Sequence, residues 1–119
     1  MKLEIVGVRD KGIIARERLV LRASDTGDAG DFIILCAVAN PDGLPISGSP
    51  RAAYWMPDVL VRKGDFIVLY TKTGTPSSKV GKSGRETYFY YIEHNETIWD
   101  KDTTAVVCNV SGHEFESNL

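Results

Sequence analysis

The sequence predicts a small all-β domain, a sandwich or barrel of short antiparallel strands. Short runs rich in β-branched and aromatic residues recur along the chain, and Gly, Pro, Asn or Asp residues bound each run. No window long enough for a helix repeats its apolar positions at helical spacing. The 119 residues suffice for one domain but not for two independent cores. We therefore expect a single domain over residues 1–119.

The first three strands are predicted from their side-chain patterns. Leu3–Val8 is rich in β-branched residues and is followed by a turn. Arg18–Arg22 places Leu19 and Leu21 on one face, with a charged residue at each end. Phe32–Val38 is a continuous apolar run, which is typical of a central strand buried on both faces.

Two further strands are predicted in the middle of the chain. Asn40–Gly43 is a turn, because Pro fixes φ and Gly accepts positive φ. We expect the chain to stay loop-like as far as Pro50, before a short strand at Ala52–Trp55. Phe66–Thr71 is the next strand, because it is an apolar run that follows an Arg-Lys-Gly-Asp turn.

The last third begins with a loop over Thr73–Gly84 that is rich in Gly, Ser and Pro. Thr87–Ile92 is an aromatic strand, and Ile98–Trp99 begins a short piece. Thr104–Val110 is predicted as a strand, and His113–Glu116 as the returning arm of a last hairpin.

Several motifs are spread over most of the chain. An aromatic strand ends in Trp-Met-Pro, a Leu-Val-Arg-Lys-Gly-Asp loop precedes an apolar strand, and Ile-Trp-Asp precedes a last strand that ends in Ser-Gly-His. These motifs occupy residues 55–57, 60–65, 66–71, 98–100, 103–110 and 111–113, and together they resemble those of lamin tail domains. The runs Glu17–Arg22 and Asp31–Val38 are similar to that family's paired first strands. The chain departs from the family at Phe32–Ile34, where Leu-x-Gly-Trp is common.

The resemblance implies an immunoglobulin-like antiparallel β-sandwich of about 8–9 short strands. It also implies a domain without known catalytic machinery. Members of this family act as interaction domains, so a protein partner is expected.

The composition limits the other classes of protein. The net charge of −2 excludes a globally basic nucleic-acid binder. No apolar run has the length of a secretory leader or of a membrane span, so we expect no membrane contact and a cytoplasmic location. Cys36 and Cys108 each lie in an apolar run and are expected to be buried, reduced thiols. Trp55 and Trp99 are both expected in the core.

One segment has an uneven charge. Between Asp65 and Glu86 there are four cations and no acidic residue. These cations, with two tyrosines on one face of the strand that follows, are candidates for contact with an anion or nucleic acid. These candidates are Lys72, Lys79, Lys82, Arg85, Tyr88 and Tyr90. The alternative is a solvated loop whose lysines give solubility and protect an edge strand.

Signals for catalysis and for metals are weak. Residues 76–83 mimic a phosphate-binding loop, but Pro76 replaces the first glycine and a β-rich run follows where a helix is needed. Asp25, Asp28 and Asp31 lack the spacing of an EF-hand, which leaves calcium as a minor alternative. His94 and His113 are too few and too distant to predict a zinc site. We expect no enzyme, cofactor or metal.

The function predicted from the sequence is therefore non-enzymatic. The domain is expected to bind a protein partner through an exposed strand edge or through the loops at one end of the sandwich. Self-association through an edge is a corollary. The alternative is an anion or nucleic-acid binder that uses the basic loop over residues 72–85.

Overall fold

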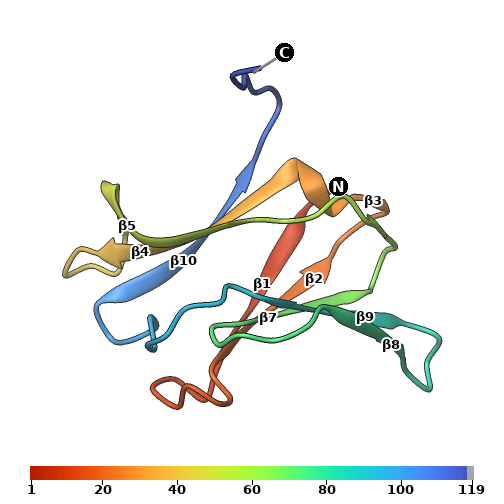
Figure 1. The fold of residues 1–119 in the computed structure, drawn as a ribbon, viewed down its shortest axis with the longest axis horizontal. Helices are drawn as coiled ribbons and strands as arrows, with labels where there is room; N and C mark the ends of the chain where they lie inside the picture. The colour runs from red at the N-terminus through yellow and green to blue at the C-terminus, as the bar shows by residue number, and fades with distance from the viewer. Residues whose placement is uncertain (118–119) are drawn as a thin grey trace.

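The computed structural model describes residues 1–117, which form an all-β domain, as predicted (Figure 1). One 3-10 turn, η1 (Ala29–Asp31), interrupts the strands. The strands are β1 (Leu3–Arg9), β2 (Arg18–Ala23), β3 (Gly27–Asp28), β4 (Phe32–Ala39), β5 (Pro45–Trp55), β6 (Leu60–Val61), β7 (Phe66–Tyr70), β8 (Ser77–Val80), β9 (Glu86–Tyr91) and β10 (Thr103–Asn109). The described residues include no helix long and apolar enough to cross a membrane.

Two sheets enclose the core. One has the strand order β1-β2-β7-β9-β8 and the other the order β10-β4-β5, while β3 and β6 form a small separate ladder. Alternation along each strand sends one row of apolar side chains inward from both sheets. The inward rows include Leu19, Leu21, Ile67 and Leu69 from the first sheet and Phe32, Ile34 and Cys36 from the second, all of which are buried in one cluster.

The sequence predicts antiparallel strands, and every pair among the described strands is antiparallel except β7-β9, which is parallel. Its register runs from Phe66 opposite Thr87 to Tyr70 opposite Tyr91. A parallel pair needs a connection of about a dozen residues or more, and residues 71–85 supply it. That connection contains β8, which forms an antiparallel hairpin with β9. Residues 73–84 are therefore not the plain loop that their composition indicates.

Three other boundaries differ from the sequence prediction. β5 begins at Pro45 rather than at Ala52, because the prolines lie on an edge strand, where a missing N–H is tolerated. Ile98 and Trp99 are buried but form no strand. Residues 113–116 form no hairpin arm and leave the body of the domain as an extended tail (Figure 1).

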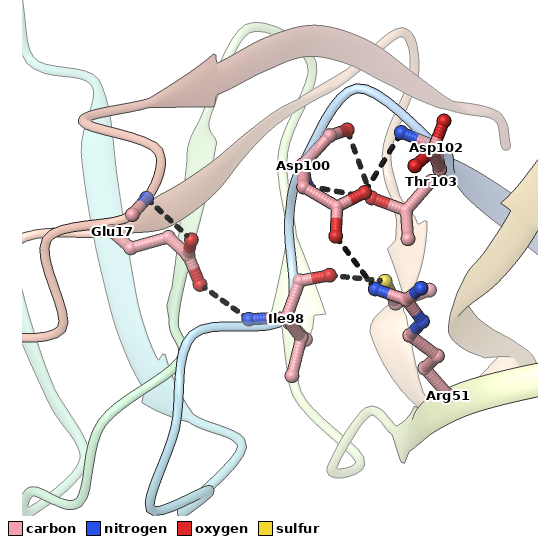
Figure 2. A network of polar contacts seen from close by, with 8 residues as sticks. Glu17, Arg51, Ile98, Asp100, Asp102 and Thr103 are labelled. Carbon is pink, nitrogen blue, oxygen red and sulfur yellow. Dashed lines mark hydrogen bonds and ion pairs between the residues drawn. The ribbon is translucent and has the colours of Figure 1, made fainter.

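A buried carboxylate joins distant segments of the core. Glu17 precedes β2, and its side chain accepts hydrogen bonds from the Thr71 hydroxyl at 2.6 Å, from the Ile98 amide at 3.1 Å and from the Gly12 amide at 3.0 Å. Figure 2 shows the bond between Glu17 and Ile98. The Ile98 carbonyl in turn accepts from the Cys36 thiol at 3.4 Å. Three hydrogen-bond donors satisfy the buried Glu17 carboxylate. These bonds fix residues 98–99 in place, although the two residues belong to no strand.

Candidate functional site

The outer face of the β10-β4-β5 sheet is apolar and uncovered. The registers place Leu35 of β4 beside Ala53 of β5 and Val106 of β10, and Ile33 beside Trp55 and Cys108. None of these side chains is charged, although antiparallel sheets normally carry polar residues on a solvated face. β4 was predicted to be buried on both faces. Ile33 and Leu35 are only partly buried, because no layer of the described chain covers this side.

A groove crosses this face. It has a volume of about 360 Å³ and is lined by Leu35, Ala37, Pro45, Ile46, Pro50 and Val106, together with the loop residues Ser47 and Gly48. Ile46 stands exposed at its rim, and Leu44 is exposed in the turn just before β5. We call this surface, from Leu44 to Trp55 across Leu35 and Val106, the apolar face.

Trp55 ends the apolar face and is 52% exposed. The prediction of a core position was wrong for Trp55, because the β5 register turns Tyr54 inward and Trp55 outward. Its indole Nε1 donates to the Gly30 carbonyl at 2.8 Å, and the His113 ring lies edge-on to it at 5.1 Å. The prediction was right for Trp99, which is buried in the core.

Arg51 lies at the register shift of β5 but does not charge the apolar face. Its guanidinium donates at 2.7 Å to the carboxylate of Asp100, in the segment before β10 (Figure 2). This hydrogen bond, with help from the Asp102 amide, lowers the pKa of Asp100. Arg51 is the one cation of β5, the strand that borders the groove, and Asp100 neutralises its charge.

The four predicted cations of the basic loop do not gather at one place. Lys72 lies over the Tyr70 ring, 5.0 Å from its centroid, at the end of β7. Arg85 lies at the other end of that strand, where its guanidinium donates to the Lys63 carbonyl at 2.7 Å. Five residues of strand separate the two ends, a span of about 13 Å. Lys79 is exposed on β8, and Lys82 is exposed in the turn that follows.

The two predicted tyrosines share one face of β9, as alternation requires, and that face is the inner one. Tyr88 is opposite Ile67, and Tyr90 is opposite Leu69 and buried. Burial raises the pKa of Tyr90, and the Tyr88 hydroxyl donates to the Leu60 carbonyl at 3.2 Å. Neither ring lies beside the lysines on an open surface.

The outward tyrosines have occupied ring faces. Tyr70 and Tyr91 stack on each other with centroids 5.4 Å apart, and Arg18 and Lys72 lie over Tyr70. A Cβ at Gly74 would come within 2.2 Å of the Tyr91 ring, so the backbone packs directly on it. Bases stack on free ring faces, which these two tyrosines do not offer.

The remaining candidate groups have structural surroundings. Asp28 caps η1 by accepting from the Gly30 amide at 2.8 Å, and it also accepts from Val59. Asp25 accepts from the next amide in the chain, that of Thr26, and with Asp31 it belongs to no metal-ligating group in the part of the chain that the structure describes.

The cysteines and the phosphate-loop mimic also have structural surroundings. Cys36 points into the core and Cys108 lies on the opposite face of the sheet, and both are free thiols. Residues 77–80 of the mimic form β8, which turns back into β9. The segment is thus a β-hairpin rather than a strand, loop and helix.

Sequence reasoning missed the apolar face, although a signal for it was present. Pro45, Ile46 and Pro50 have the composition of a loop, so the sequence does not predict their place in β5, which pairs with β4. The signal was the continuous apolar run of β4, whose outward half needs a cover that no predicted helix provides. Comparisons of the chain with family models, curated proteins and solved structures found no match.

Proposed function

We propose that this chain is a non-enzymatic interaction domain, and that an extended segment of a protein partner adds to the β5 edge and covers the apolar face. The observation that carries the proposal is the combination of a terminal strand with an uncharged groove beside it. The resemblance to lamin tail domains, which act as interaction domains, supports the same function. Two free cysteines favour a reducing location such as the cytoplasm.

The β5 edge is open along its regular part. Ala52–Trp55 pairs with β4 on one side only, so its other side has unpaired backbone groups. Pro45 and Pro50 interrupt the edge further back, because proline has no N–H to donate. An added strand therefore has about four residues to pair with. The groove between Pro45 and Val106 is not lined by Ala52–Trp55, so the partner segment reaches it by continuing along the apolar face past Pro50.

The chemistry of the groove favours an apolar protein segment over an anion. Its lining carries no cation, and Arg51 at its border is engaged by Asp100. The flat part of the face measures about 14 Å by 25 Å from strand spacing and rise, which is small for a stable dimer interface. A partner that also pairs with the edge strand gains main-chain hydrogen bonds that face-to-face self-association lacks.

The test is a comparison of matched surface variants. Ile46→Lys places a charge at the groove rim, whereas Val80→Lys makes the same kind of change at an exposed residue of β8. We expect the wild type and Val80→Lys to retain the same protein from an extract of the native host, and Ile46→Lys to lose it. The retained protein, once purified, should bind the wild type at least tenfold more tightly than Ile46→Lys in calorimetry. Equal binding to all three forms would refute the proposal.

The same variants also test whether the domain associates with itself. Sedimentation velocity of the wild type at rising concentration should show a monomer. A dimer that Ile46→Lys dissolves and Val80→Lys keeps would replace the external partner with a second copy of the chain.

A further inference from the structure

We propose that a polar cleft at the start of β7 is a binding site for a dianionic phosphate group. The cleft lies on the five-stranded sheet, away from the apolar face, and has a volume of about 330 Å³. Three cations and one carboxylate line it: Arg22, Lys63, Arg85 and Glu4. They come from four different segments of the chain, so the fold brings them together.

A buried carboxylate fixes the two loops that supply Lys63 and Arg85. Asp65 is only 4% exposed, and it accepts from the Arg62 amide at 2.8 Å and from the Glu86 amide at 3.0 Å. The first bond closes the turn that contains Lys63, and the second anchors the residue after Arg85. Asp65 does not line the cleft, so its charge organises the site without occupying it.

Gly64 makes the approach of the two cations possible. Its φ is +89°, a conformation that favours glycine, and a Cβ there would lie 2.8 Å from the Arg85 guanidinium carbon. The missing side chain lets Arg85 lie across the turn, where its Nη1 donates to the Lys63 carbonyl at 2.7 Å. The Gly64 amide donates to the Ala23 carbonyl at 2.9 Å, which ties the turn to the end of β2.

The charge of the cleft matches a dianion. Glu4 is bound to Arg22 at 2.9 Å, so the lining sums to three positive charges and one negative charge. A phosphate monoester carries about −2 at neutral pH, whereas a phosphodiester carries one negative charge per phosphate. Guanidinium groups have the planar donor geometry that suits phosphate oxygens. The ester of a small molecule and free inorganic phosphate share this chemistry.

The test is an NMR titration of the folded chain with N-acetyl-O-phosphoserine amide, inorganic phosphate and sulfate. We expect the amides of Lys63, Gly64 and Arg85 to shift together. Arg85→Gln should weaken binding about tenfold, as the loss of a charge-assisted contact. Lys72→Gln is the matched control, because Lys72 follows the opposite end of β7 and contacts Tyr70, and it should change the affinity less than twofold.

The pH dependence identifies the charge state that is bound. Phosphoserine has a second pKa of about 6, so its affinity should fall about fourfold between pH 7.5 and pH 5.5. Sulfate stays dianionic over this range and should bind equally at both values, which controls for titration of the protein. The ligand with the higher affinity, the ester or the free ion, indicates which source of phosphate the cleft binds.

Two results would overturn the proposal. One is an equal response of Arg85→Gln and Lys72→Gln, which would mean that binding follows net charge alone. The other is a single-stranded oligonucleotide that binds more tightly than the ester, with an affinity that falls steeply with salt. That result would make the cleft part of a nucleic-acid surface instead. Neither outcome bears on the apolar face, which shares no residue with the cleft.

Discussion

The hydroxyl of Thr71 donates a 2.6 Å hydrogen bond to the carboxylate of Glu17, and both side chains are completely inaccessible to solvent. The contact joins the segment before β2 to the residue after β7. The same carboxylate oxygen accepts from the Ile98 amide, which attaches the segment before β10. One acidic side chain therefore links the end of the β2-β7 ladder, where the Thr71 amide also donates to the Glu17 carbonyl at 3.2 Å, to the segment before β10.

Replacing Glu17 should destabilise the domain strongly. Glu17→Ala leaves two buried donors, the Thr71 hydroxyl and the Ile98 amide, without an acceptor, so we expect a loss of about 3–5 kcal/mol in the free energy of unfolding. Glu17→Gln should cost less, because one amide oxygen still accepts. Urea denaturation followed by circular dichroism gives both values. Glu114→Ala, in the exposed tail, is the control, and a Glu17→Ala variant as stable as this control would contradict the network's role.

The buried thiol of Cys36 should make the domain less stable at alkaline pH. Burial raises the pKa of its thiol from 9.0 to about 11, so the folded state holds a proton that the unfolded state has released in this window. The free energy of unfolding should thus be unaffected below pH 9 and fall by up to about 2 kcal/mol between pH 9 and pH 11.

A variant separates this effect from other titrations. Tyr54, Tyr88 and Tyr90 also have raised pKa values through burial, and they contribute a fall of the same sign at higher pH. Cys36→Ala should be less stable at neutral pH but should show a smaller decline between pH 9 and pH 11. Parallel denaturation curves for the two proteins across this range would contradict the assignment.

The two tryptophans should respond differently to substitution. Trp99→Ala opens a core cavity and should cost about 3–5 kcal/mol. Trp99→Phe should lower the free energy of unfolding less than most tryptophan truncations do. The Trp99 Nε1 is buried without a hydrogen-bond partner among the described residues, and phenylalanine removes the cost of burying this unpaired N–H. Trp55→Phe should cost about 1 kcal/mol, the value of one hydrogen bond to Gly30.

Fluorescence quenching checks the exposure of each ring directly. Iodide should quench the emission of Trp99→Phe, in which Trp55 alone remains, and should leave Trp55→Phe nearly unaffected. Equal quenching of the two variants would contradict the outward position of Trp55.

The sequence predicted the class of the fold because its signals are local. Alternation and turn residues located β2, β4, β7 and β9 to within one or two residues. It could not predict the parallel pairing of β7 with β9, because strand order depends on contacts across the whole chain. The extent of β5 was missed because prolines and glycines in an edge strand have the composition of a loop.

The candidate sites were harder to predict for the same reason. Of the six predicted contact residues, Arg85 enters the polar cleft, whereas Lys72 lies at the opposite end of β7 and Tyr90 is in the core. Folding of the sheet brings Lys63 and Arg22 next to Arg85. Their spacing in the sequence therefore gives no signal for the cleft. Arg85 was found because its segment lacks acids, which is a property of the sequence alone.

The most direct test of the central claim is hydrogen–deuterium exchange of the chain, free and bound to its captured partner. Strand addition at the β5 edge predicts new protection of the amides over Ala52–Trp55, while the equally terminal β8 exchanges as before. Protection confined to β8 or to the turn at residues 81–85, with β5 unchanged, would contradict the account.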